Sequence, residues 1–296
     1  MKPFKNLSVK YSMTQTKNIM EFKNRSQAKK LTGLSYLGGC GVSSKIIKNT
    51  KVLKIDTYVL YLAPHSMSGY NTCPMATKEC IKGCLNTSGR AGMEINSTKV
   101  ENSIVNARIA KTKLFYEQRT FFFDWLIAEI QAAKNLSESK DHGFAVRLNG
   151  TSDINWMAYK IGGKTIFEIF PDVQFYDYTK VPNRFNNVPA NYHLTLSYTG
   201  YNWNDCKTVL DKGGNIAVVF NLQKWYNSRP ENIVPFPDTF NGYEVIDGDV
   251  TDYRPNDDKG VIVGLRFKSI ADKINEANVR KSKFVVQVKS NYLQAA

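Results

Sequence analysis

The sequence has no apolar run long enough to cross a lipid bilayer, and its N-terminus lacks the apolar region of a secretory signal. These absences predict a cytoplasmic protein with no membrane partner. Internal repeats and low-complexity tracts are also missing, so nothing in the sequence divides residues 55–290. Apolar residues make up 42% of the 296 residues and charged residues 22%, which excludes global disorder and predicts a sizeable core.

Cysteine is scarce, and the odd total of five argues against a framework of disulfide bonds. Cys40 and Cys206 stand alone, and we expect each to be a small buried hydrophobe. The other three, Cys73, Cys80 and Cys84, lie on one short segment that follows an apolar run. In a reducing compartment, clustered cysteines are typical of metal ligands or redox groups.

Acidic residues are rare at both ends of the chain. Residues 1–54 carry twelve basic residues and one acid, and residues 264–296 carry seven basic and two acidic residues. The net charge of +14 is therefore concentrated at the ends, which are candidate contacts for nucleic acid. The alternative is a solvated, partly disordered arm. No helix-turn-helix, zinc-finger or RNP motif indicates sequence-specific reading of bases.

Short apolar segments alternate with helical patterns from residue 55 onward. Seven segments read as strands: 57–62, 144–149, 173–178, 192–197, 215–220, 244–247 and 260–265. Five segments between or after them read as helices: 97–117, 120–134, 166–170, 203–212 and 269–279. This alternation predicts an α/β fold, a partial (β/α)6-type barrel of mainly parallel strands. We expect residues 1–54 to form a basic N-terminal extension and residues 55–296 to form the barrel that carries the cysteines.

Polar residues follow these strands at their carboxyl ends, where barrels of parallel strands place their functional groups. Two charged residues, Arg147 and Asp177, even lie inside apolar strands, where a charge is costly unless it is paired. We expect both to face a polar central cavity; the alternative is a buried structural pair. The candidate catalytic residues are Arg147, Asp153, Asp177 and Lys180. The candidate cofactor-binding residues are Asn149, Ser152 and Ser197.

The spacing of the three clustered cysteines is C-x6-C-x3-C, which differs from the paired C-x2-C pattern of common zinc sites. Three cysteines can hold a [4Fe-4S] cluster and leave its fourth iron open, which is the interpretation we favour. A closed zinc site would need a fourth ligand, for which His65 is the nearest candidate and Cys40, His142 and Cys206 are others. Three unrelated free thiols are the remaining alternative.

A loop with three cysteines directly after the first strand of a β/α partial barrel resembles the radical S-adenosylmethionine enzymes, whose usual spacing is C-x3-C-x2-C. The resemblance implies that Cys73, Cys80 and Cys84 hold the cluster and that S-adenosylmethionine chelates the open iron. An external donor would reduce the cluster, and an electron from the reduced cluster would then cleave S-adenosylmethionine to a deoxyadenosyl radical. The residues that would bind polar parts of the cofactor or substrate are Arg147, Asn149, Ser152 and Asp153. The residues that would line the cavity further round are Asp177, Lys180 and Ser197.

Three segments are similar to an uncharacterised family of bacteriophage-encoded proteins: Ser68–Pro74 with the cysteines that follow, Arg147–Asp153 and Phe175–Lys180. The resemblance covers roughly residues 55–268. It implies a location in the cytoplasm of an infected bacterial host, and it says little about activity.

Two other functions stay open. In the first, the loop with the three cysteines binds a metal that has only a structural role, and the basic termini bind nucleic acid. In the second, the chain is a hydrolase in which aspartates near residues 247–257 bind a divalent metal: Asp247, Asp249, Asp252 and Asp257.

Overall fold

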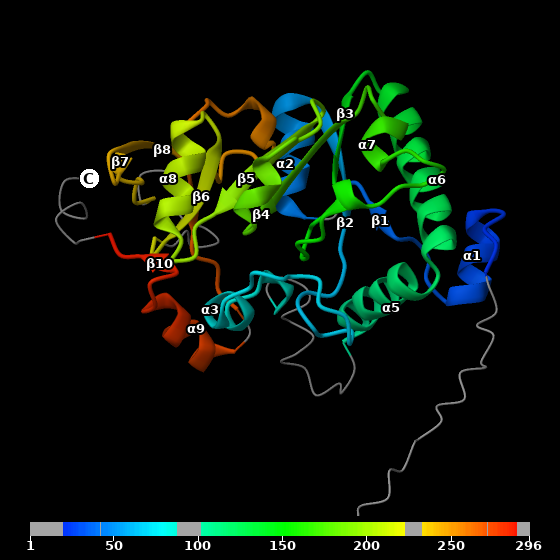
Figure 1. Cartoon of the computed structure of the whole chain (residues 1–296), viewed down its shortest axis with the longest axis horizontal. Helices are drawn as coiled ribbons and strands as arrows, with labels where there is room; N and C mark the ends of the chain where they lie inside the picture. The colour runs from blue at the N-terminus through cyan, green and yellow to red at the C-terminus, as the bar shows by residue number, and fades with distance from the viewer. Residues whose placement is uncertain (1–19, 42, 88–101, 223–232, 271, 289–296) are drawn as a thin grey trace, which may run out of the picture.

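The computed structural model describes residues 20–41, 43–87, 102–222, 233–270 and 272–288. A ten-stranded sheet forms its centre, with the strand order β1-β2-β3-β4-β5-β6-β9-β8-β7 and with β10 paired to β6. Figure 1 shows helices packed around this sheet. The strands from β2 to β8 in this order are parallel, while β1 and β7 pair antiparallel at the two edges.

The strands of the sheet have these bounds: β1 Gly38–Gly39, β2 Ile55–Leu60, β3 Gly143–Arg147, β4 Gln174–Thr179, β5 Tyr192–Ser197, β6 Asn215–Phe220, β7 Thr239–Phe240, β8 Tyr243–Asp247, β9 Ile262–Arg266 and β10 Val285–Val286. The predicted α/β class and the mainly parallel sheet are confirmed. The sheet is open in the described residues, and a barrel-type curvature stays a prediction.

The α-helices have these bounds: α1 Arg25–Thr32, α2 Ser44–Leu53, α3 Lys78–Lys82, α5 Ser103–Glu117, α6 Arg119–Glu138, α7 Ile166–Ile169, α8 Trp203–Asp211 and α9 Lys273–Arg280. Short 3-10 helices are η1 Leu85–Thr87, η2 Trp156–Ala158, η3 Pro182–Phe185 and η5 Arg254–Asn256. Residues 97–101 of the helix predicted at 97–117 lie outside the described residues.

Helices cover both faces of the sheet at β2. Thr57 accepts a hydrogen bond from Asn49 of α2 at 3.2 Å, whereas its neighbour Tyr58 donates one to Glu129 of α6 at 2.7 Å. Because successive side chains of a strand point to opposite faces, α2 and α6 lie on opposite sides of the sheet. The α6 side holds the larger hydrophobic cluster, and a second cluster lies between α8 and strands β5 and β6.

The described part of the basic N-terminal segment is built into this core. Ala28, Leu34 and Leu37 are buried in the same cluster as α6. The backbone N–H groups of Leu37 and Gly38 both donate to the buried carboxylate of Glu129, at 3.1 Å. The division at residue 54 stays a prediction, but residues 20–54 contribute both a strand and core side chains.

Candidate functional site

The three cysteines lie on the connection that leaves the carboxyl end of β2. Thr72 fixes the first part of this connection: its hydroxyl donates to the carbonyl of Ala63 at 2.7 Å, and its N–H donates to the carbonyl of His65 at 3.0 Å. His65 has the left-handed backbone angle φ 40° that this tight turn requires. The turn therefore places Cys73 at a defined position beside the end of the sheet.

Cys73 is half-buried against the loop that follows β3. The N–H of His65 donates to its Sγ at 3.3 Å, and the Sγ lies 4.0 Å from the carbonyl oxygen of Thr151. Burial raises the pKa of the Cys73 thiol, although the hydrogen bond from His65 opposes this. The two loops are joined because the N–H of Asp153 donates to the carbonyl of Thr72 at 2.8 Å.

Cys80 and Cys84 are positioned by α3. Thr77 caps this helix by accepting a hydrogen bond from the N–H of Cys80 at 3.2 Å, and Gly83 ends it. A Cβ on Gly83 would lie 2.9 Å from Cγ1 of Val279, so the absence of a side chain allows α3 to pack closely on α9. Figure 1 shows α3 and α9 side by side below the sheet.

The three thiols lie close enough for their charges to interact. The pKa of Cys84 is raised to about 11, chiefly by burial and in part by the charges of Cys80 and Cys73. A backbone hydrogen bond from Asn86 acts in the opposite direction. The three predicted ligands therefore lie near one another, and the raised pKa values of Cys73 and Cys84 keep these two thiols protonated at neutral pH when no metal is bound.

Lys180 is the predicted site residue that reaches the cysteines. It follows β4, and its side chain hydrogen-bonds with Cys80. Burial lowers the pKa of Lys180, but Cys80, Asp153 and Cys73 raise it by more, so its net pKa stands above the ordinary value. A stably protonated lysine beside three thiols favours their deprotonated, metal-binding form.

Asp153 is held by its own ion pair. It accepts from Arg184 of η3 and, through its other oxygen, from the N–H of Lys180 at 2.9 Å. Because Asp153 also bonds to Thr72, it connects the loops after β2, β3 and β4. Its contacts are those of a residue that positions both Lys180 and the cysteine loop.

Asn149 and Ser152 are occupied within the loop after β3. The buried amide oxygen of Asn149 accepts from Ser152 Oγ and from the N–H of Ile154, both at 2.9 Å, and from Trp156 Nε1 at 3.1 Å. Its amide nitrogen donates to the carbonyl of Ile154 at 3.0 Å. These contacts make Asn149 the centre of the loop's own fold.

Arg147 and Asp177 lie on opposite faces of the sheet. Arg147 pairs with Asp252 at 2.6 Å and stacks over the rings of Tyr176 and Tyr178, with centroid distances of 5.6 and 5.1 Å. Asp177, which lies between those two tyrosines in the sequence, points the other way.

The carboxylate of Asp177 accepts from the N–H groups of Leu148 and Asn149, at 3.3 and 2.8 Å, and from Tyr192 at 3.1 Å. Burial raises the pKa of Asp177 to about 7. Ser197 lies at the end of β5, and its carbonyl accepts from Asn202 at 3.2 Å. In these bonds neither residue contacts the cysteine loop, and both residues stabilise strand ends.

The four aspartates considered for a hydrolase are paired with basic side chains. Arg266 bridges Asp247 and Asp249 at 3.0 and 3.4 Å, and Arg254 lies 3.1 Å from Asp257. Asp252 pairs with Arg147, as described above. Among the described residues, no three His, Cys, Asp or Glu side chains are arranged to hold a metal ion as they stand.

The other proposed zinc ligands have different surroundings. The Nδ1 atom of His65 lies 3.4 Å from Ser66 Oγ, and that of His142 lies 3.3 Å from Asp56. Cys206 is buried in the cluster around α8, as expected of a small hydrophobe, whereas Cys40 is exposed. The expectation that Cys40 is buried is therefore wrong, because it lies on the surface turn after β1.

Arg108 of α5 is a site residue that sequence reasoning missed. Its guanidinium donates to Asn86 and lies 5.0 Å from the ring centroid of Tyr61. Burial lowers the pKa of Arg108, while Tyr61 and Cys84 raise it. The signal in the sequence was its position between Ala107 and Ile109 in an apolar helical stripe, because an arginine that is removed from water even in part needs a partner.

A family model described as Gene product 88 matches residues 17–287, which is most of the chain. The chain belongs to the Gene product 88 family. The predicted membership of a phage-type family is thereby confirmed at this level. No curated protein and no solved structure matches the chain, so the resemblance to radical S-adenosylmethionine enzymes gains no support from these comparisons.

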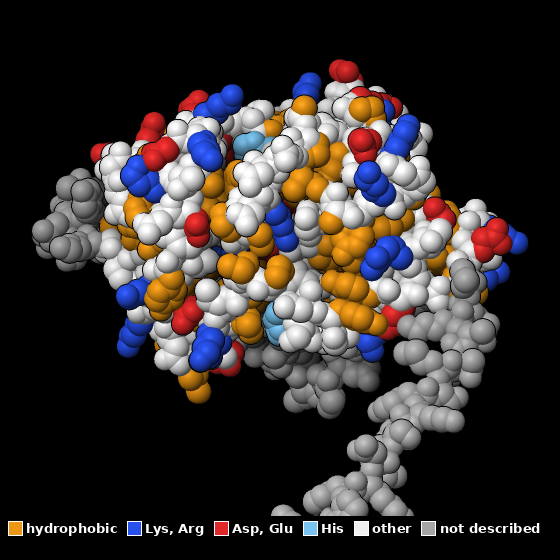
Figure 2. All heavy atoms as spheres, viewed as in Figure 1, with side chains coloured by type: hydrophobic (Ala, Val, Ile, Leu, Met, Phe, Trp, Pro, Cys, Tyr) orange, Lys and Arg blue, Asp and Glu red, His pale blue; other side chains and the backbone are white. Residues whose placement is uncertain are grey.

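The basic ends that are predicted to contact nucleic acid lie partly outside the described residues, which leave out 1–19 and 289–296. Gly89–Gly92 at the end of the cysteine loop also lie outside the described residues. Figure 2 shows Lys and Arg side chains interspersed with Asp and Glu on the drawn face. No helix within the described residues is long and apolar enough to span a membrane.

Proposed function

We propose that this member of the Gene product 88 family is an iron-sulfur protein in which Cys73, Cys80 and Cys84 hold a [4Fe-4S] cluster with one open iron. The observation that carries the proposal is the proximity of the three thiols to one another and to Lys180. Their place on the connection after the first long parallel strand also supports it, because functional groups gather at that edge of parallel sheets.

The donor chemistry fits such a cluster. Thiolates are its usual ligands, and the cations Lys180 and Arg108 lie where they would offset negative charge on the bound group. Since no three ligands are arranged for a metal ion in the described residues, loading would require the thiol side chains to turn toward one another. It would also release protons from thiols whose pKa burial has raised.

When bound, a cluster with an open iron can pass an electron to a molecule that ligates that iron, and S-adenosylmethionine is the molecule we propose. The sequential order of strands β2 to β6 is the order that a partial barrel of this kind requires. An external electron donor is needed. The protein's own contribution is to orient the ligands, through Thr72, Thr151 and Asp153, and to hold a proton on Lys180.

The experiment is anaerobic purification and reconstitution of the full chain, followed by iron, sulfide and zinc analysis. The proposal expects a brown protein with iron and sulfide, both lost in Cys80→Ala. Cys206→Ala is the matched control, because that cysteine is remote in sequence and buried in another cluster. A colourless protein with stoichiometric zinc would instead identify a structural metal loop.

A second step separates an iron-sulfur protein from one that uses S-adenosylmethionine. Titration of the reduced, loaded protein with S-adenosylmethionine should change the electron paramagnetic resonance spectrum of the cluster, because the ligands of one iron change. An unchanged spectrum in a protein that does carry the cluster would refute the S-adenosylmethionine part alone.

A further inference from the structure

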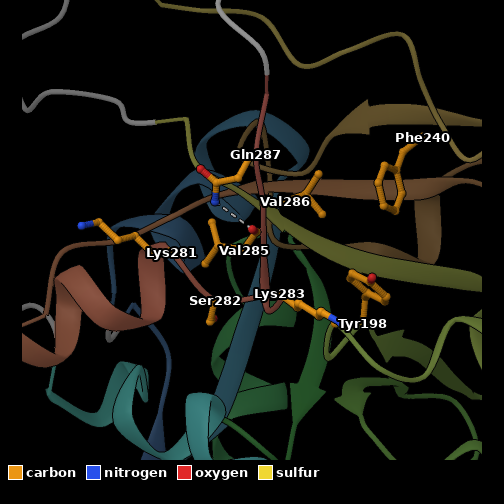
Figure 3. A pocket seen from close by; sticks show the side chains of 9 residues that line it. Tyr198, Phe240, Lys281, Ser282, Lys283, Val285, Val286 and Gln287 are labelled. Atoms are coloured by element: carbon orange, nitrogen blue, oxygen red, sulfur yellow. Dashed lines mark hydrogen bonds between the residues drawn. The ribbon is translucent and has the colours of Figure 1, made fainter.

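A groove of about 330 Å³ lies where the C-terminal strand meets the end of β5, and Figure 3 shows it from close by. It is lined by residues from three segments of the chain: Tyr198, Gly200, Phe240, Lys281, Ser282, Lys283, Val285, Val286 and Gln287. No acidic residue lines it. Two aromatic rings and two lysines therefore share one open depression.

The two lysines are available to an external anion. Both are exposed, and neither forms an ion pair among the described residues. In Figure 3, Lys283 extends toward Tyr198 and Lys281 extends the other way, so their ammonium groups are separated along the groove. The spacing of two positive groups along a depression suits a ligand with repeated negative charges.

An exposed aromatic ring lies beside the lysines. Tyr201 is 63% exposed, and the ammonium of Lys283 lies 5.5 Å from its ring centroid. Large exposed aromatic rings next to cations are the elements with which proteins hold single-stranded nucleic acid, because bases stack on the rings while lysines contact phosphates.

The chain backbone at the groove is held in place. Val285 and Val286 of β10 pair with β6, beyond the point where β5 ends. A Cβ on Gly200 would lie 2.5 Å from the backbone carbon of Lys283, and φ of Gly200 is 89°, so only glycine allows this close approach. The lysines therefore project from a fixed support.

We propose that this groove binds single-stranded nucleic acid, with phosphates at Lys281 and Lys283 and a base stacked on Tyr201. Charge complementarity selects the occupant: the groove is lined by two lysines that form no ion pair within the described part of the chain and by no acid, in a protein of net charge +14. The volume is at the lower end of the range for ligand pockets, which suits one nucleotide unit of a longer strand. The site does not depend on the proposed iron-sulfur cluster.

The groove adjoins the cysteine site through one helix. Lys281–Lys283 directly follow α9, and Val279 of the same helix contacts Gly83 beside Cys84. A nucleic-acid strand bound in the groove would therefore lie next to the helix that packs on the cysteine segment. The substrate of a nucleic-acid-modifying enzyme would have to bind at such a place.

The test is fluorescence anisotropy of the full chain with labelled oligo-dT, oligo-U and a DNA duplex at several salt concentrations. The variants are Lys281→Ala/Lys283→Ala and Tyr201→Ala. We expect the double variant to reduce the slope of log affinity against log salt by about 1.4, because each phosphate contact to a single strand contributes about 0.7. Tyr201→Ala should weaken binding about tenfold with little change of slope.

The control is Lys29→Ala/Lys30→Ala, which removes the same charge from exposed positions of α1 at the other side of the molecule (Figure 1). It should leave affinity within about twofold. Stronger binding of either single strand than of the duplex supports the site, and the difference between oligo-U and oligo-dT shows which of the two strands it prefers. Equal losses in both double-lysine variants, preference for the duplex, or no binding by the wild-type chain at low salt would each overturn the proposal. Circular dichroism melts of every variant exclude unfolding as the cause.

Discussion

Asn149→Ala is the substitution that separates a loop-forming role from a cofactor-binding one. The Asn149 side chain is 4% exposed, and its oxygen accepts from the N–H of Ile154 and from Nε1 of Trp156, which is 1% exposed. Removing the amide leaves both donors without their acceptor inside the protein. A buried donor that loses its partner costs about 1–3 kcal/mol.

The two donors together give an expected loss of about 3–4 kcal/mol in the free energy of unfolding. The Ser152 hydroxyl, which also donates to Asn149, can rotate to another acceptor and adds little. A loss of this size is a large fraction of the about 5–15 kcal/mol that stabilises a typical domain. We expect the urea midpoint to fall with an unchanged denaturant slope.

Asn155→Ala is the matched control, because Asn155 is an exposed asparagine of the same loop with no side-chain bond at the start of η2. It should change stability by less than about 0.5 kcal/mol. If Asn149→Ala lowered the free energy of unfolding as little as this control, the hydrogen bonds of Asn149 would not be what stabilises the loop. If it were mild and also abolished binding of S-adenosylmethionine, Asn149 would be a cofactor ligand.

Three further predictions concern buried charges. Burial raises the pKa of Asp177 to about 7, so between about pH 4 and about pH 7 the folded chain keeps a proton that the unfolded chain releases. As the pH rises through this window, the free energy of unfolding should fall by up to about 1.4 kcal/mol per pH unit. Asp177→Asn should remove that slope in urea titrations at several pH values; an unchanged slope would contradict it. Arg147→Met leaves the carboxylate of Asp252 buried without its partner and should cost about 3–5 kcal/mol, most of which Arg147→Met/Asp252→Asn recovers; equal losses in the single and double variants would show that the pair is not coupled. Glu129→Ala should cost about 3 kcal/mol, because the N–H of Leu37 and two other donors lose their acceptor; a loss under 1 kcal/mol would show that the N-terminal segment is attached in another way.

The sheet was predictable because its signals are local. Strands at residues 192–197 and 215–220 are β-branched and aromatic runs with turns on both sides, and the structure has them at the predicted bounds. The helix predicted at 203–212 ends one residue earlier, before the turn at Gly213. Such boundaries depend on the residues themselves and on their immediate neighbours.

The partners of buried charges were not predictable because they lie far apart in the sequence. Arg147 pairs with Asp252 across 105 residues, and Leu37 bonds to Glu129 across 92. The few apolar residues of segment 1–54 that join the core, such as Leu34, were also not predictable, because the segment as a whole is polar and basic. The grouping of the cysteines was predictable from their spacing. The positions of Lys180 and Arg108 near these cysteines were not, because they depend on how β4 and α5 pack in the folded chain.

The central claim is that Cys73, Cys80 and Cys84 hold a cluster, and metal content tests it most directly. Iron, sulfide and zinc should be measured per chain after anaerobic reconstitution, for the wild type, for each single Cys→Ala variant of the three, and for Cys206→Ala. The proposal predicts about four iron and four sulfide in the wild type and in Cys206→Ala, with both largely lost in the other variants. One zinc per chain, or iron that survives the loss of Cys80, would contradict it.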